Sequence, residues 1–262
     1  MPDFTTHTPG TFCWPELSTT DQKGAVTFYK GLFGWNVNDQ PMGPNETYSM
    51  FEMRGKSIGA AYTMRKDQRD QHVPPHWGSY VAVANADESV KRAEQLGAKT
   101  LAPAFDVMDA GRMAVLQDPT GAVFQIWQGK KHPGAGILNE PGALCWTELM
   151  TRDTPGAESF YTKLFGWSAK TSDMGPMKYT EFSNQGKTGA GMMEITKEMG
   201  PSVPPNWMPY FQVTNVDTTF AKAKELGGAE IVGPREIPNV GRFAVIKDPQ
   251  GAVFSIFTPA PR

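Results

Sequence analysis

The sequence predicts an α+β protein built from two similar domains, each with two β-α-β-β-β units. Two observations support this fold class. The pentapeptide Cys-Trp-Pro-Glu-Leu at residues 13–17 returns as Cys-Trp-Thr-Glu-Leu at residues 145–149, so the chain is internally duplicated. Each half also shows the order strand, amphipathic helix and further strands twice over. A Gly- and Pro-rich linker at 130–141 separates the domains, which we expect at 8–129 and 142–262.

The duplication extends well beyond the pentapeptide. At an offset of 130 to 132 residues the same motifs recur in the same order: Leu-Phe-Gly-Trp at 32–35 and 164–167, Val-Pro-Pro at 73–75 and 203–205, and Asp-Pro-x-Gly at 118–121 and 248–251. Because the offset hardly changes, the loops of the two halves differ by only a residue or two. We therefore expect both halves to have the same fold.

The first unit begins with a strand over residues 12–18, whose side chains alternate between two faces. Asp21 is a suitable N-cap for the helix that follows, and Gly34 a suitable C′ residue to end it. In the second copy, Pro155 falls in the first helical turn, where its missing N–H costs little. Two strands are then expected near residues 47–53 and 56–64.

The second unit repeats this order from Trp77 onwards. We expect a strand over residues 80–84 and a helix that Asp87 caps and Gly97 ends. Two more strands flank residues 118–121, which have Asp, Pro and Gly where a type I turn prefers them.

Composition excludes several classes of partner. The 262 residues are 39% hydrophobic and 20% charged, which is typical of a globular protein. A formal net charge of −2 does not favour nucleic acid or an anionic membrane. No apolar run is long enough to span a bilayer, and residues 1–10 lack the features of a secretion signal. With only two cysteines and no zinc-type spacing, we expect a cytoplasmic protein.

The duplicated motifs resemble those of the vicinal oxygen chelate superfamily, which includes glyoxalase I, extradiol dioxygenases and the fosfomycin- and bleomycin-resistance proteins. The motifs are the first strand before Asp21, the Phe-Tyr and Leu-Phe-Gly-Trp helix end, and the Asp-Pro-x-Gly hairpin before the last strand. The resemblance implies that paired units curl into two half-open barrels, each of which surrounds a metal in typical family members.

Family members bind their metal through a His or Gln on the first strand, a His on the fifth and a Glu on the last, with a further Glu on the fourth in glyoxalase-type members. By spacing, the resemblance places these positions at Trp14, Tyr80 and Gln125, at Trp146, Tyr210 and Ser255, and near residues 61–63 and 192–194. Among them, only Glu194 is an ordinary ligand for a hard cation. We therefore expect no metal and no cofactor.

Two glutamates remain as candidate catalytic groups. Because side chains alternate along a strand, Glu16 lies on the same face as Trp14, and Glu148 on the same face as Trp146. The resemblance makes this the cavity face, lined by Trp14, Tyr80, Gln125, Trp146, Glu194, Tyr210, Gln212 and Ser255. A buried glutamate could act as a general acid or base. Alternatively, each glutamate binds a neighbouring tyrosine or backbone amide and only stabilises the barrel.

The sequence leaves open which units share a site. By analogy with dimers of single-domain relatives, the first unit would pair with the fourth and the second with the third. One site would then combine Trp14 and Glu16 with Tyr210 and Ser255, and the other would combine Trp146, Glu148 and Glu194 with Tyr80 and Gln125. Pairing within each domain would give different partners.

The resemblance implies a glyoxalase-, bleomycin resistance- or dioxygenase-like protein that binds or transforms a small organic molecule. Because the metal-ligand positions are lost in both halves, we expect it to act without a metal. A non-catalytic protein that sequesters its ligand is one alternative, and a divalent-metal lactoylglutathione lyase-type enzyme is another. We expect a small-molecule ligand and a chain that is a monomer or a dimer.

Overall fold

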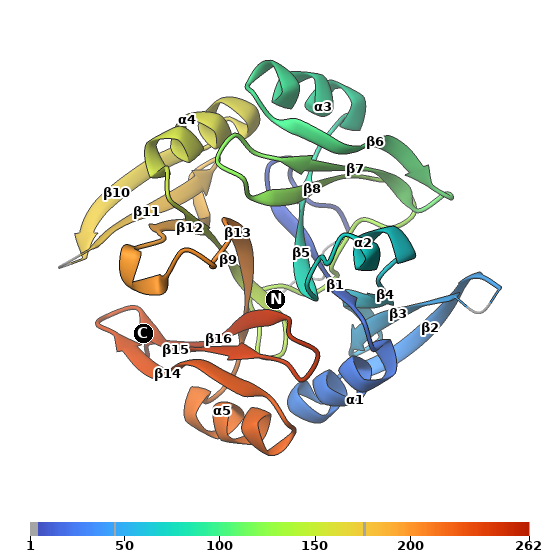
Figure 1. The fold of residues 1–262 in the computed structure, drawn as a ribbon, viewed down its shortest axis with the longest axis vertical. Coiled ribbons are helices and arrows are strands. Elements are labelled where there is room, and N and C mark those ends of the chain that lie inside the picture. The colour runs from blue at the N-terminus through green and yellow to red at the C-terminus, as the bar shows by residue number, and fades with distance from the viewer. Residues whose placement is uncertain (1–4, 45, 175–176, 262) are drawn as a thin grey trace.

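The computed structural model describes residues 5–44, 46–174 and 177–261, and within them the chain forms two eight-stranded mixed sheets (Figure 1). The strands of the first sheet are β1 (Phe12–Thr19), β2 (Asn36–Gly43), β3 (Glu46–Met53), β4 (Lys56–Thr63), β5 (His76–Ala82), β6 (Lys99–Val107), β7 (Gly111–Gln117) and β8 (Val123–Gly129). Those of the second are β9 (Leu144–Thr151), β10 (Ser168–Met174), β11 (Met177–Asn184), β12 (Lys187–Glu194), β13 (Asn206–Gln212), β14 (Ala229–Ile237), β15 (Gly241–Lys247) and β16 (Val253–Pro259).

Helices follow the first strand of every unit, as predicted. They are α1 (Gln22–Phe33), α3 (Ala86–Gln95), α4 (Thr154–Phe165) and α5 (Val216–Glu225), and two short segments, α2 (Lys66–Asp70) and the 3₁₀ turn η1 (Lys197–Met199), connect units. The predicted α+β class with four β-α-β-β-β units is confirmed, and the sheets remain open. Among the described residues, no helix is both long and apolar enough to cross a membrane.

The two units of each half share one sheet. The strand order is β2-β3-β4-β1-β5-β8-β7-β6 in the first sheet and β10-β11-β12-β9-β13-β16-β15-β14 in the second. In both sheets the first strands of the two units, β1 with β5 and β9 with β13, pair antiparallel at the centre. The strand at 36–43 and its counterparts were not identified from the sequence, because these edge strands are largely exposed and lack a regular alternation of apolar and polar residues.

Local sequence explains most helix ends. The Asp21 carboxylate accepts a hydrogen bond from the Gly24 amide at 3.0 Å, and Gly34 ends α1 with a φ of 74°. That left-handed conformation is the one in which glycine meets no steric penalty. The Asp-Pro-x-Gly turn also forms as predicted, with the Gly121 amide 3.1 Å from the Asp118 carbonyl.

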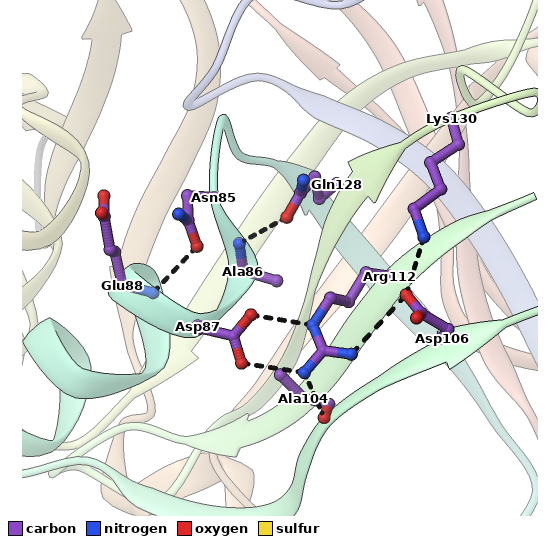
Figure 2. A network of polar contacts seen from close by, with 9 residues as sticks. All are labelled: Asn85, Ala86, Asp87, Glu88, Ala104, Asp106, Arg112, Gln128 and Lys130. Atoms are coloured by element: carbon purple, nitrogen blue, oxygen red, sulfur yellow. Dashed lines mark hydrogen bonds and ion pairs between the residues drawn. The ribbon is translucent and has the colours of Figure 1, made fainter.

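The predicted N-cap Asp87 is wrong by two residues. Asn85 caps α3 instead, accepting a hydrogen bond from the Glu88 amide at 3.1 Å. Arg112 binds both carboxylate oxygens of Asp87 at 2.8 Å, so that side chain is already occupied (Figure 2). The predicted strand over 80–84 likewise shifts, since β5 begins at His76 and ends at Ala82.

Hydrophobic packing, unlike strand pairing, joins opposite halves of the chain. One core cluster combines residues of α1, such as Phe28, with Phe211 and Phe254 of the second half. A second cluster combines Phe124 of the first half with Phe160 of α4. Figure 1 accordingly shows α1 beside α5 and α4 beside α3. The first unit therefore packs with the fourth, and the second with the third.

Two buried polar clusters reinforce this exchange. Tyr29 of α1 donates a hydrogen bond to Asp248 at 2.9 Å, and Trp77 donates to the Tyr29 hydroxyl at 2.9 Å. In the repeat, Tyr161 donates to Asp118 at 2.7 Å and Trp207 to Tyr161 at 2.7 Å. The Asp-Pro-x-Gly turn of each half thus holds the first helix of the other half.

Candidate functional site: a buried glutamate with two tyrosines in each sheet

Strand register brings the three family ligand positions side by side in each half. In the first sheet Trp14 lies opposite Tyr80, and Tyr80 lies opposite Gln125. In the second sheet, the same register aligns Trp146 with Tyr210 and Tyr210 with Ser255. The cross-domain combination, in which Trp14 and Glu16 would meet Tyr210 and Ser255, is therefore wrong. The sheet forms within each half, although the core forms between halves.

Glu16 lies at the centre of a polar cluster in the first sheet. Its carboxylate accepts hydrogen bonds from Tyr48 at 2.6 Å and from Tyr80 at 2.7 Å. The Trp14 indole donates to the Tyr48 hydroxyl at 3.1 Å. Hydrogen bonds from hydroxyl to carboxylate are short and strong, so this cluster has a defined geometry.

The second sheet repeats the cluster around Glu148. Tyr179 and Tyr210 each donate to its carboxylate at 2.8 Å, and Trp146 donates to the Tyr179 hydroxyl at 3.0 Å. Tyr48 and Tyr179 were not identified from the sequence as site residues. They occupy equivalent positions on β3 and β11, so a search for tyrosines duplicated between the halves would have found them.

Burial sets the protonation of these clusters. Removal from water raises the pKa of both Glu16 and Glu148, and the tyrosine hydrogen bonds only partly oppose this effect. The pKa of Tyr80 and that of Tyr210 are raised by burial and by the adjacent carboxylate. Each cluster can therefore hold a proton on its carboxyl at a pH where a free glutamate is ionised.

Other predicted pocket residues differ in where they lie. Gln212 is on the same face of β13 as Tyr210 and is partly exposed. Ser255 is buried and donates to the Ala244 carbonyl at 2.8 Å. Glu194, by contrast, is exposed and does not join the cluster. Because Met193 lies opposite Tyr179, the next residue, Glu194, must point to the other face of the sheet.

The two clusters differ by one pair of compensating residue replacements. In the first sheet, Gly78 lies opposite Glu16, and a Cβ atom at Gly78 would come within 3.0 Å of the Gln125 amide. In the second sheet, Met208 lies opposite Glu148, and a serine replaces the glutamine. A polar amide thus fills the space in the first half, and an apolar thioether fills it in the second.

This exchange makes a testable prediction. Gly78→Met alone is expected to lower the free energy of unfolding by about 1–3 kcal/mol, because the new side chain overpacks against Gln125. Adding Gln125→Ser, which reproduces the second half, is expected to restore most of that stability. Urea unfolding of the single and double variants measures both effects. Equal stabilities of the single and double variants would contradict the idea that these two replacements compensate for each other.

Linker residues cover the first cluster on one side. The His132 ring packs edge-on against Trp14 with the ring centroids 4.5 Å apart. The backbone carbonyl of His132 accepts a hydrogen bond from the Trp127 indole at 2.9 Å. Burial lowers the pKa of His132 to about 4, so the ring is neutral at physiological pH. Trp14 is only 4% exposed as a result, whereas Trp146 of the second cluster is partly exposed.

The donor set does not fit a divalent cation. Indole nitrogen is not a metal ligand, and the amide of Gln125 and the hydroxyl of Ser255 are weak ones. Each glutamate already accepts hydrogen bonds from two tyrosines. Within residues 5–44, 46–174 and 177–261, no three His, Cys, Asp or Glu side chains are grouped so that they could hold a metal ion.

Proteins similar to this chain include curated relatives over its whole length. The protein called "Putative glyoxylase CFP32" of Mycobacterium tuberculosis is 40% identical over 266 residues, covering 100% of both chains. "Anthracycline biosynthesis protein DnrV" of Streptomyces peucetius is 34% identical and covers 95% of this chain and 93% of that protein.

Solved structures with the same fold are much less similar in sequence. The 2,3-dioxygenase LapB from Pseudomonas sp. KL28 has a TM-score of 0.63 at 13% identity, covering 96% of this chain and 94% of that one. A Mn(II)-bound glyoxalase from Novosphingobium aromaticivorans has a TM-score of 0.65 at 14% identity, covering 95% and 82%.

Two family models match the chain in tandem. Residues 16–127 match the glyoxalase-like domain, and residues 143–256 match the glyoxalase/bleomycin resistance protein/dioxygenase superfamily. Together with the full-length relatives, these matches cover both halves of the duplication. The chain therefore belongs to the glyoxalase/bleomycin resistance protein/dioxygenase superfamily and carries two of its domains in one polypeptide.

Proposed function

We propose that this protein binds a small hydroxylated aromatic molecule against its first sheet and exchanges a proton with it through Glu16, without a metal. The observation that carries the proposal is the carboxyl of Glu16, which burial favours in its protonated form and which Tyr48 and Tyr80 orient. A carboxyl held in this way can donate a proton to a ligand carbonyl and accept one from an enol or phenol.

Three features favour the first cluster over the second. Glu16 is partly exposed, whereas Glu148 is only 5% exposed. Gln125 is 7% exposed, and its Oε1 has no hydrogen-bond partner among the described residues. A buried acceptor without a partner is unfavourable, so a ligand that supplies a hydroxyl would gain from binding there. Met208 fills the corresponding space in the second cluster.

The ligand class is supported by the aromatic side chains and by two relatives. The cluster is surrounded by aromatic side chains, since Trp14 packs against His132 and Trp127 against Tyr80, and this environment suits a planar aromatic ligand beside Glu16. Two relatives 34% identical to this chain carry the name anthracycline biosynthesis protein. Because anthracyclines contain a hydroxylated anthraquinone, we extend that ligand chemistry to this chain.

A binding protein that performs no reaction is the second candidate. The aromatic flanks of the cluster would serve sequestration equally well, as in bleomycin resistance-type relatives. Turnover of the bound molecule separates the two functions, since a sequestering protein releases its ligand unchanged. A metal-dependent lyase is disfavoured by the donor set described above.

Binding of a dihydroxyanthraquinone to chelator-treated protein tests the proposal. Tryptophan fluorescence reports binding, and ligand absorbance reports any conversion. Glu16→Gln is expected to weaken binding about tenfold, the loss expected when one hydrogen bond is removed. Glu148→Gln is the matched control and should leave the affinity unchanged.

Two outcomes would contradict the proposal. Equal affinities of the wild type and both variants would remove Glu16 from the site. Binding that chelator abolishes and a divalent cation restores would overturn the metal-free mechanism.

A further inference from the structure

The first half of the chain fills a groove on the outer face of its sheet with the side chain of Gln22. Its Nε2 donates to the Thr47 carbonyl at 3.0 Å, the Ser49 hydroxyl at 2.8 Å and the Ala61 carbonyl at 3.1 Å. Its Oε1 accepts from the amide and the hydroxyl of Thr63 at 3.1 and 2.9 Å. Every polar atom of this carboxamide is therefore bound where β3 and β4 diverge.

The second half has the same backbone but lacks the glutamine. Thr154 is the first residue of α4, as Gln22 is the first residue of α1. Thr180 pairs with Met192 as Ser49 pairs with Ala61, and both ladders run as far as a tyrosine, Tyr179 or Tyr48. The peptide groups that hold the Gln22 carboxamide thus recur on β11 and β12.

A groove remains where that side chain would lie. It has a volume of about 390 Å³ and is lined by Thr154, Pro155, Glu158, Ser159, Thr171, Lys178, Thr180 and Glu194. The threonine is too short to reach the strands as Gln22 does. The Thr180 hydroxyl, which corresponds to that of Ser49, lies 2.8 Å from that of Thr171 and keeps a lone pair for a donor.

We propose that this groove binds the primary carboxamide of a small polar molecule, in the place that Gln22 occupies in the first half. The two N–H groups of the carboxamide would be shared among the Lys178 and Met192 carbonyls and the Thr180 hydroxyl. Its oxygen would accept from the Glu194 amide. This site is separate from the glutamate clusters, since Glu194 points away from Tyr179.

Charges around the groove restrict the rest of the ligand. Lys178 offers a cation for a carboxylate, while Glu158 and Glu194 offer anions for an ammonium group. A free amino acid with a carboxamide side chain carries all three groups. L-Glutamine is therefore the probe we choose, and L-glutamate is its comparison. The glutamate side chain has no N–H to donate to the strand carbonyls and is repelled by the two acidic residues.

Titration of the full-length protein with L-glutamine, followed by amide chemical shifts, tests the proposal. We expect saturable shifts at the Glu194 and Thr180 amides and an affinity at least tenfold higher than for L-glutamate. Thr154→Gln places the first half's own side chain in the groove and is expected to abolish binding. Gln22→Thr should open a groove with the same carboxamide contacts but without the three charges, because Thr47, Val26 and Thr63 stand in place of Lys178, Glu158 and Glu194. L-Glutamine is therefore expected to bind there more weakly than in the second half.

Thermal unfolding of each variant establishes that it is folded, so a loss of binding can be assigned to the groove. Unchanged L-glutamine binding in Thr154→Gln would overturn the proposal. Absence of saturable shifts in the wild type would do so as well. If Gln22→Thr unfolds, the wild type and Thr154→Gln still decide the question.

Discussion

Replacing Tyr29 with alanine is expected to lower the free energy of unfolding by about 3–5 kcal/mol, the usual loss for a large buried aromatic side chain. Tyr29 is fully buried, stacks on Trp35 and meets Phe254 edge-on. Its hydroxyl holds the Asp248 turn of the other half. Tyr161→Ala should have the same effect, because the repeat builds the same contacts around Asp118.

Both substitutions should destabilise the two halves together. The two large hydrophobic clusters each contain residues from both halves, so neither half keeps its main core when the other unfolds. Urea unfolding followed separately by far-ultraviolet circular dichroism and tryptophan fluorescence should give coincident single transitions. Tyr29→Phe is the control, with an expected loss of about 1–3 kcal/mol because the two hydrogen bonds of the hydroxyl are lost while the ring remains. Two separate transitions, only one of them shifted by Tyr29→Ala, would contradict an exchanged core.

The wild type should lose stability relative to a Glu16→Gln/Glu148→Gln variant as the pH rises. Both glutamates have a raised pKa in the folded protein, so the folded state binds these protons more tightly than the unfolded chain. Their contribution is fully present below the pKa of a free glutamate, about 4.3, and is lost as the pH rises through the folded pKa. For each glutamate, a pKa difference of one is worth about 1.4 kcal/mol.

Urea unfolding of both proteins over a series of pH values measures this difference. Comparison with the variant cancels the surface carboxylates, such as Asp87 and Asp217, whose pKa values are lowered by arginine partners. A stability difference that does not depend on pH would contradict the raised pKa values. A wild type that gains stability relative to the variant with rising pH would mean that folding lowers the pKa of these glutamates, which is the opposite of the raised pKa inferred here.

Repetition and local chemistry were enough to predict the fold class and most of the order of helices and strands. The duplicated pentapeptide revealed the repeat. Three local features formed as expected, because each depends on only a few neighbouring residues: the Asp21 cap, the Gly34 helix end and the Asp-Pro-x-Gly turns. The edge strands β2 and β6 were not identified, because exposed strands lack the alternating apolar pattern that marks a half-buried one.

The candidate site could be predicted only in part. Alternation along a strand placed Glu16 beside Trp14 on one face, but it could not show which other strands supply the tyrosines. Tyr48 reaches Glu16 from β3, which is 32 residues away in the sequence. Glu194 was assigned to the pocket by position near the end of β12, and a difference of one residue puts it on the opposite face.

The four units associate differently through their strands and through their helices. The strands pair within each half, whereas helices α1 and α4 pack against the opposite half. The sequence motifs do not distinguish these arrangements, because both halves carry the same strands and the same turns. The distinction arises from long-range contacts such as Tyr29 with Asp248.

Infrared spectroscopy of the carboxyl groups tests most directly whether Glu16 and Glu148 remain protonated at a pH at which a free glutamate is ionised. The difference spectrum between the wild type and the Glu16→Gln/Glu148→Gln variant isolates the two groups, and isotope-labelled glutamate identifies their bands. We predict a protonated carboxyl band that persists well above the pH at which glutamate in a peptide ionises. Carboxylate bands that appear for both residues at the ordinary glutamate pKa, about 4.3, would contradict the account.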